Sequence, residues 1–144
     1  RLGIIANQPP MALDFLEREG LLSLFEVVIL DSQHQARKPD VALYRIALEE
    51  AKVDPPEALM VGDRLDNDVI PSRRIGMRAL LLWLDAREKA WTPRDKWGEL
   101  MLPVLERLPA PRWDNILPAE RPMAMARSWA ELQDAVDSAW EASL

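Results

Sequence analysis

Short apolar runs that alternate with segments of helical periodicity constrain the fold of this chain more than any other feature. The apolar runs cover residues 2–6, 26–30, 58–61 and 79–84. The helical segments cover residues 11–19, 40–51 and 66–75. Short buried strands separated by amphipathic helices are typical of βα units around a parallel sheet. The sequence therefore predicts an α/β fold whose parallel sheet carries helices on both faces.

Cap and turn residues set the ends of the predicted helices. Gly20 suits the C′ position after the first helix, and Gly76 lies where the third helix should end. Asp40 is a plausible N-cap of the second helix. Pro71 falls early in the third helix, where its missing N–H costs little. The buried stripe of the second helix is predicted to hold Leu43, Ile46 and Ala47.

The alternating pattern stops after Leu84. Residues 85–127 are rich in proline and contain Trp91, Trp97 and Trp113, with a helix predicted over 96–108. Order returns at Ser128, a candidate cap, before a terminal helix marked by Trp129, Leu132, Val136 and Trp140. We therefore predict a core over 1–84, an irregular insertion over 85–127 and a C-terminal helix of the same core over 128–144. Most of the tryptophans are expected to cover the core, with a substrate-facing or partner-facing surface as the alternative.

Charge and composition narrow the classes of partner. The chain has 144 residues and a net charge of −6, so a nucleic-acid backbone or an anionic membrane is not expected as its main partner. It contains no cysteine, which excludes disulfides and thiolate sites and agrees with a cytoplasmic protein. The longest apolar run, residues 21–30, is too short to span a bilayer. If the protein forms an oligomer, the tryptophan-rich segment is where we expect the contact.

An acidic cluster follows the third apolar run. The predicted strand runs through Gly62 into Asp63, and Asp66 and Asp68 follow at the start of the next helix. Ligands of open α/β sheets bind at the carboxyl ends of the strands, and Mg²⁺ prefers oxygen ligands. Asp66 and Asn67 are better explained as helix-start residues that interact with exposed N–H groups. Asp63 precedes the helix and is the stronger candidate for a metal ligand, while Asp68 fits either role.

Three segments, taken in order, resemble motifs of the haloacid dehalogenase superfamily and in particular its phosphatase-like members. Residues 2–7, Leu-Gly-Ile-Ile-Ala-Asn, resemble the second motif of that family. Residues 36–40, Ala-Arg-Lys-Pro-Asp, are similar to the third motif, and residues 62–68 followed by Gly76 and Met77 are similar to the fourth. The resemblance covers residues 2–84 and implies a three-layer, Rossmann-like core from the second motif onward.

The resemblance also implies a chemistry and a set of site residues. In the family, an Asp on the central strand attacks phosphorus to form an aspartyl-phosphate, and a second Asp two residues later acts as general acid and base. Carried onto this chain, Asp63 would be the Mg²⁺ ligand, and Lys38 would neutralise charge on the nucleophile and the phosphoryl group. Asp68 would hold metal-bound waters or orient Lys38. Ala6 and Asn7, together with Lys38, would line the substrate phosphate.

The chain departs from the family pattern in two ways. At Ala6 the family has a hydroxyl that binds the phosphoryl group, and at Gln35 it often has glycine. The nucleophile motif, Asp-x-Asp after the first strand, belongs upstream of Leu2 in the family, as does the cap, and neither is found in these residues. That strand would lie between those ending at Ala6 and Val61, so its absence would leave two unpaired strand edges. We expect a preceding segment of a longer protein, or a second chain, to supply it.

The leading hypothesis is therefore a Mg²⁺-dependent phosphatase that acts on a small phosphorylated metabolite and that these residues alone do not complete. One alternative is a non-catalytic binding or regulatory protein with the same fold, since Ala6 replaces the hydroxyl and fold alone does not fix function. A second is a metal-free 2-haloacid dehalogenase, against which the Gly62–Asp63 pair counts. His34, the one histidine, lies in a polar loop and is expected to be solvated.

Overall fold

The structure is a computed structural model that describes residues 1–84 and 112–143. Its strands are β1 (Gly3–Ala6), β2 (Val27–Leu30), β3 (Leu59–Gly62), β4 (Arg78–Leu82) and β5 (Ala124–Ala126). Its α-helices are α1 (Met11–Arg18), α2 (Val41–Ala51), α3 (Ile70–Arg74) and α5 (Leu132–Glu141). The predicted alternation of strands and helices is thus confirmed over the first 84 residues, with strand ends shifted by one or two residues.

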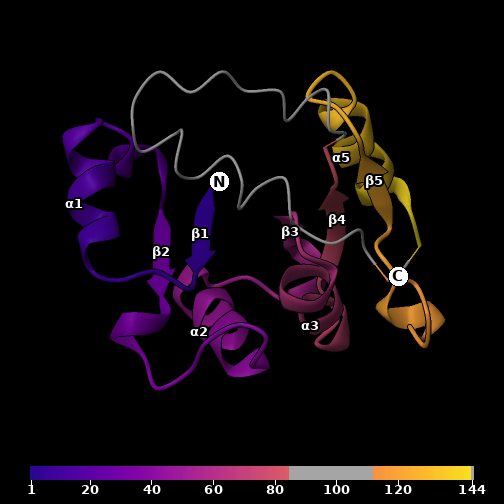
Figure 1. Ribbon diagram of the computed structural model, residues 1–144, viewed down its shortest axis with the longest axis horizontal. Coiled ribbons are helices and arrows are strands. Elements are labelled where there is room, and N and C mark those ends of the chain that lie inside the picture. The colour runs from indigo at the N-terminus through magenta and orange to yellow at the C-terminus, as the bar shows by residue number, and fades with distance from the viewer. Residues whose placement is uncertain (85–111, 144) are drawn as a thin grey trace.

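The strands form two parallel sheets. β1 pairs with β2, and in the second sheet β4 lies between β3 and β5. In Figure 1, β1 and β3 stand beside each other at the centre of the molecule, yet they belong to different sheets. This is the place where the sequence predicted a missing strand. The edge of β1 that faces β3, and the facing edge of β3, therefore have no strand partner within the described residues.

Helices cover both faces of the sheets. Ala79 and Leu81 of β4 pack with Leu65 and Val69 before α3, while Leu80 packs on the opposite face with the α5 side. On the other half, α2 packs against β2. α1 connects β1 to β2 in the chain, and α2 also packs against β1. The fold is the three-layer, Rossmann-like α/β arrangement that the sequence predicted.

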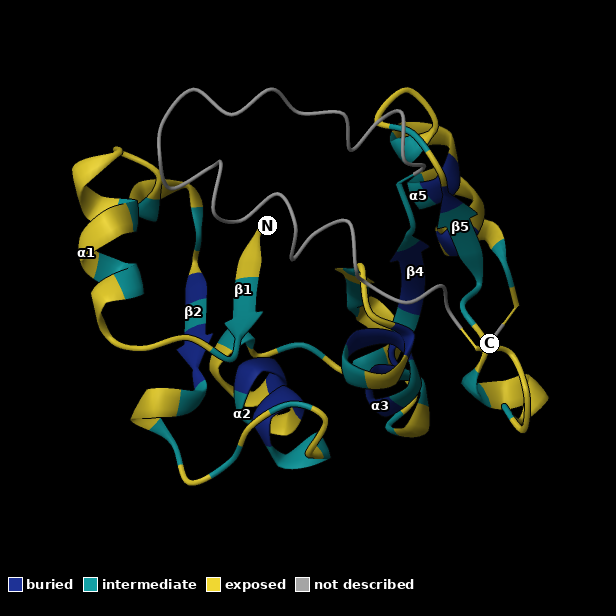
Figure 2. Cartoon of the chain, in the orientation of Figure 1, coloured by how far each residue is buried: buried dark blue, intermediate teal, exposed yellow. Residues whose placement is uncertain are grey.

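An apolar cluster joins the β1–β2 half of the molecule to the β3–β4–β5 half. Tyr44 and Leu48 of α2 are buried together with Met77, which precedes β4. Ile5 of β1 and Met60 of β3 both pack against this cluster. Figure 2 shows the buried parts of α2 and of the turn before α3 facing each other across the centre of the molecule. The half-sheets are therefore held together by helix packing.

Several helix ends agree with the predicted caps. The Asp40 side chain accepts a hydrogen bond from the Ala42 N–H at 2.9 Å, so the predicted N-cap is confirmed. Gly20 and Gly76 have φ values of 70° and 85°, the left-handed conformation expected after a helix. The buried residues of α2 are Leu43, Tyr44, Ala47 and Leu48, and Ile46 packs partly buried against the same cluster as Leu43 and Ala47, so the predicted stripe is confirmed except that it omitted Tyr44 and Leu48.

Other differences lie in the second half of the chain. β5 forms at the end of the segment predicted to be irregular, because its three small or flexible residues can pair with β4 without any strand-like run in the sequence. α5 begins at Leu132, three residues later than the first predicted turn, and buries Ala135 and Ala139. Trp113, Trp129 and Trp140 are exposed by 42%, 59% and 43%, so none of these three is a buried core residue. Trp91, Trp97 and the helix predicted over 96–108 lie outside the described residues. In the described part of the chain, no helix has the length and apolar character needed to cross a membrane.

Candidate active site

The predicted site residues from the third and fourth motifs meet at the carboxyl ends of the strands. The Lys38 ammonium group lies 2.6 Å from one Asp68 carboxylate oxygen. Both side chains are largely withdrawn from water, with 14% and 4% of their surfaces exposed. Lys38 comes from the loop before α2 and Asp68 from the turn after β3, so this pair also links the two halves of the sheet. A charge pair in such a sheltered place is screened far less by salt than a surface pair.

Asn7, just after β1, fixes the backbone of Lys38. Its side-chain amide donates to the Lys38 carbonyl at 2.9 Å and accepts from the Lys38 N–H at 2.8 Å. This pair of bonds holds the loop residue as a strand neighbour would. Ala6, the last residue of β1, directly precedes Asn7, and its methyl side chain can form no hydrogen bond. Asn7 is thus placed to orient Lys38, and the substrate contacts predicted for Ala6, Asn7 and Lys38 stay predictions.

Gly62 makes room for Asp68. A β-carbon at residue 62 would lie 2.4 Å from the Asp68 β-carbon and 2.5 Å from its Oδ2 oxygen, which no side chain could tolerate. That same Oδ2 oxygen accepts the backbone N–H of Arg64 at 3.0 Å. Glycine at the end of β3 therefore lets the turn fold back until Asp68 reaches both Arg64 and Lys38. The sequence showed the glycine, but nothing in the sequence alone revealed this close approach.

The turn that carries Asp68 is a π-helical turn over Leu65–Val69, followed directly by α3. The helix predicted over 66–75 is thus confirmed in extent to within one residue, but its first half is π-helical and only its second half is α-helical. π-turns of this kind are rare and concentrate at functional sites. The buried Ser72 hydroxyl donates to the carbonyls of Asp68 and Val69, at 2.7 and 2.9 Å. The Tyr44 hydroxyl donates to the Asn67 carbonyl. Burial first, and the Asp68 charge second, raise the pKa of Tyr44, so its hydroxyl stays a donor at neutral pH.

Asp63 differs from Asp68 in being open to solvent. It follows β3 directly, is exposed, and makes no hydrogen bond or ion pair within residues 1–84 and 112–143. An unengaged carboxylate at the carboxyl end of a strand is a suitable hard-oxygen ligand for Mg²⁺. Across those same residues, no group of three His, Cys, Asp or Glu side chains comes together as a metal site. The described residues thus supply one suitable Mg²⁺ ligand, Asp63, and the other protein ligands would have to come from outside these residues.

Arg64 and Asp66 form a second, exposed pair on the same turn. Two nitrogens of the Arg64 guanidinium bind the two Asp66 oxygens, at 3.0 and 2.6 Å. This pairing, with smaller contributions from the backbone N–H groups of Asp66 and Asn67, lowers the pKa of Asp66. The N–H contributions agree with the predicted helix-start role. The arginine partner was not predicted.

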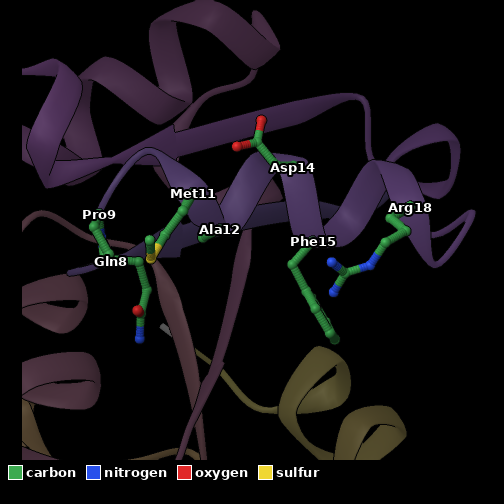
Figure 3. Close-up of a pocket in the computed structure, with 7 residues that line it drawn as sticks. All are labelled: Gln8, Pro9, Met11, Ala12, Asp14, Phe15 and Arg18. Atoms are coloured by element: carbon green, nitrogen blue, oxygen red, sulfur yellow. The ribbon is translucent and has the colours of Figure 1, made fainter.

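A surface pocket runs along α1, away from the Lys38–Asp68 pair. Its lining residues are Gln8, Pro9, Met11, Ala12, Asp14, Phe15 and Arg18. In Figure 3, the side chains of Met11, Phe15 and Arg18 project from the same side of the helix. Met11 and Phe15 are both exposed. This pocket begins next to Asn7, but none of the charged site residues lines it.

Comparison with known proteins agrees with the family resemblance of the sequence motifs. The family model described as haloacid dehalogenase-like hydrolase matches residues 1–82. A glyceraldehyde 3-phosphate phosphatase of Pyrococcus abyssi is 36% identical over 81 residues, covering 56% of this chain and 34% of that protein. A phosphoserine phosphatase of Thermus thermophilus is 38% identical over 85 residues, covering 58% of this chain and 33% of that protein.

A solved structure extends the likeness to the whole fold. The crystal structure of a haloacid dehalogenase-type phosphatase from Thermococcus onnurineus aligns with a TM-score of 0.64 and 25% identity. The alignment covers 96% of this chain and 51% of that structure, so the chain spans about half of it and about a third of the two phosphatases above. With a matching family model over more than half of its residues, the chain belongs to the haloacid dehalogenase-like hydrolases.

Proposed function

We propose that this chain forms the lysine-bearing and metal-binding part of a Mg²⁺-dependent phosphatase that acts on a small phosphorylated metabolite. The observation that carries the proposal is the arrangement at the carboxyl edge. There, a sheltered Lys38–Asp68 pair lies on the same edge as the exposed, unengaged carboxylate of Asp63. A fixed cation and a hard-oxygen ligand are what phosphoryl transfer requires, because the reaction develops negative charge on the phosphoryl oxygens. Two of the relatives described above are named as phosphatases, which favours this class of substrate.

The proposal assigns the place between β1 and β3 to the strand that carries the nucleophile. β1 and β3 run parallel to their own partners, and each leaves one edge without a strand in the described chain. A strand inserted there would end next to Asn7 on one side and Asp63 on the other. An Asp-x-Asp sequence at its carboxyl end would then place the attacking carboxylate and the acid–base carboxylate beside Lys38. The strand comes from another segment of a longer protein or from a second chain.

Each site residue of this chain then has a distinct role. Mg²⁺, held by Asp63 and by carboxylates of the added strand, would offset the repulsion between the nucleophile and the phosphate. Lys38 supplies the fixed positive charge next to the phosphoryl oxygens. Asp68 holds the lysine, and its two oxygens are already engaged by Lys38 and the Arg64 N–H, so we assign it to orientation ahead of direct metal binding. Asn7 fixes the lysine backbone, and Ala6 leaves the phosphate without a hydroxyl donor at that point.

The test compares Asp63→Asn with Asp66→Asn in the longest natural form of the protein that contains these residues. Hydrolysis of p-nitrophenyl phosphate is measured with and without Mg²⁺, and Mg²⁺ binding is measured by calorimetry. Asp63→Asn should lower turnover by on the order of 10²-fold or more and weaken Mg²⁺ binding. Asp66→Asn makes the same charge change three residues away, on an exposed pair, and should keep nearly full activity.

Three other results would point elsewhere. Undiminished turnover in Asp63→Asn would remove the metal assignment. Chloride release from a 2-haloacid without Mg²⁺ would favour the dehalogenase alternative. Mg²⁺ binding of ordinary strength with no turnover of any phosphoester would favour a non-catalytic binding or regulatory role.

A further inference from the structure

The backbone of the π-turn leaves one carbonyl without its usual helical donor. The N–H groups of Asp68 and Val69 both bond to the Arg64 carbonyl, at 2.8 and 3.3 Å. In an α-helix the Asn67 carbonyl would accept from residue 71, four positions on. Residue 71 is Pro71, which has no N–H. The carbonyl just before Asp68 therefore lacks the N–H donor that an α-helix would supply.

Tyr44 provides a donor from another element. Its hydroxyl donates to the Asn67 carbonyl, while its ring is fully buried against Leu48 and Met77. The ring is held by packing on α2, so the hydroxyl has a fixed direction. The bond attaches the peptide unit next to Asp68 to a rigid helix. On the α3 side, the Ser72 hydroxyl binds the next two carbonyls of the same turn.

Tyr44 and Lys38 reach the turn from the same helix start. α2 begins at Val41 under the Asp40 cap, with Lys38 in the loop just before it and Tyr44 in its first turn. Lys38 binds the Asp68 side chain, and Tyr44 binds the backbone one residue earlier. The two bonds run in parallel from the β1–β2 half of the molecule to the β3–β4–β5 half. Together they fix both the backbone and the carboxylate of the residue that orients the lysine.

We propose that Tyr44 is a positioning residue, whose hydroxyl holds the π-turn in the path that brings Asp68 to both Lys38 and the Arg64 N–H. Its catalytic consequence rests on the proposed function, because it acts on turnover through Lys38. Its structural consequence does not depend on any activity. A tyrosine that served only as a core residue would contribute through its ring, and phenylalanine would replace it without a local effect at Arg64.

The test is Tyr44→Phe, which keeps the ring and removes only the hydroxyl. Amide hydrogen exchange is followed by NMR in the full chain, with the Arg64 N–H as the reporter because it bonds to the Asp68 carboxylate. Loss of one hydrogen bond that holds the turn should lower protection of the Arg64 amide by about 5-fold, with Leu80 in the central strand unchanged. The native-state chemical shift of the Arg64 amide and the side-chain ammonium signal of Lys38 should change as well.

Two further variants calibrate the result. Ser138→Ala removes a hydroxyl-to-carbonyl bond of the same kind, from Ser138 to the Asp134 carbonyl at 2.8 Å on α5, and should leave the Arg64 amide unaffected. Asp68→Asn disturbs the same network from the carboxylate and should shift the same reporters as Tyr44→Phe. In a catalytically complete protein, Tyr44→Phe should lower kcat by about 5- to 10-fold with KM almost unchanged.

The results that overturn the proposal are distinct from those that overturn the phosphatase assignment. If Tyr44→Phe leaves the Arg64 reporters unchanged, or lowers protection equally at every amide, the residue is a core residue only. A variant that fails to fold also overturns it, because a hydroxyl that only positions a turn is not needed for folding. A selective effect at Arg64 in a protein without phosphatase activity would support the positioning role and count against the proposed function.

Discussion

The carboxyl edge of the molecule and the middle of its sheet differ in how completely their polar groups are satisfied. At the edge, the Asn7 amide binds Lys38, Lys38 binds Asp68, and Asp68 binds the Arg64 N–H. In the middle, β1 and β3 each have an edge with no partner strand among the described residues. No residue of β1 or β3 is buried, and an open strand edge is a ready template for pairing with another strand, so the second situation is the unusual one.

The contrast teaches that the charged part of the site is built without the central strand. Lys38 and Asp68 are positioned by a helix start, a π-turn and one asparagine, all of which lie in this chain. A strand placed between β1 and β3 would therefore lie beside a Lys38 ammonium group that this chain has already positioned. Preorganised charge of this kind is what makes electrostatic stabilisation effective, because little reorganisation is needed during the reaction.

The largest effect should come from breaking the sheltered pair. Lys38→Met keeps much of the side-chain volume but leaves the Asp68 charge without its partner in a place where only 4% of its side chain is exposed. Removing one member of a buried pair costs about 3–5 kcal/mol, because the other charge stays desolvated. We expect the free energy of unfolding to fall by that order in urea denaturation.

The double variant Lys38→Met/Asp68→Asn tests whether the cost comes from the stranded charge. Since it removes both charges, it should lie closer to the wild-type stability than Lys38→Met does. If both variants are equally destabilised, then the loss of stability comes from lost packing of the Lys38 methylene groups and not from the unpaired Asp68 charge.

The next effect concerns the close approach that the edge requires. Gly62→Ala would drive a β-carbon to within 2.5 Å of the Asp68 side chain, so the turn must move away from Lys38. Overpacking of this kind costs about 1–3 kcal/mol, and we expect the Arg64 amide to lose its hydrogen bond at the same time. Thermal unfolding and the NMR signal of that amide measure the two effects.

Gly3→Ala is the matched control on the other half of the sheet. There the nearest atoms to an added β-carbon are the Val27 carbonyl oxygen at 3.4 Å and its β-carbon at 3.7 Å, which is ordinary contact. Replacing a strand glycine by alanine in such a position should leave stability unchanged or raise it slightly. Equal destabilisation by both substitutions would show that the space beside Gly62 has no special importance.

The sequence predicted those parts of the fold that depend on local patterns. Apolar runs located β1 to β4 within one or two residues, and the cap at Asp40 and the glycine at Gly20 followed from backbone chemistry. β5 escaped prediction because a three-residue edge strand of alanine and methionine carries no strand pattern of its own. Its pairing with β4, a contact between distant residues, is what makes it a strand.

The site was predictable in its charged residues and not in the groups that hold them. Lys38, Asp63 and Asp68 stood out through motif spacing, and the structure brings Lys38 and Asp68 together. Tyr44 was missed, although the lack of an N–H at Pro71 was visible in the sequence. Nothing local shows that a tyrosine 23 positions before Asn67 would supply the donor. Such contacts depend on how α2 and α3 pack, which no single segment encodes.

The smallest effect should come from the exposed Arg64–Asp66 pair, on the same turn as Asp68. Half of the arginine side chain and 65% of the aspartate side chain are exposed, so Asp66→Asn should cost less than about 1 kcal/mol at pH 7. The hydrogen bond from Arg64 lowers the pKa of Asp66, so the folded protein binds this proton less readily than the unfolded chain. The contribution is therefore fully present above the unfolded pKa of about 4 and is lost as the pH falls through the folded value.

Urea denaturation of wild type and Asp66→Asn at pH 7, 5 and 3 measures this contribution, since the difference between the two proteins should shrink toward zero at the lowest pH. Added salt should also shrink it at pH 7, because exposed charges are screened. The Lys38→Met effect should be nearly insensitive to salt, since its pair is sheltered from solvent. No difference between the two proteins at any pH would mean that the side chain acts only as a hydrogen-bonding cap, a role in which asparagine serves almost as well. The expected results separate two ion pairs on one turn by their response to solvent, which follows from burial and not from their equal distances of 2.6 Å.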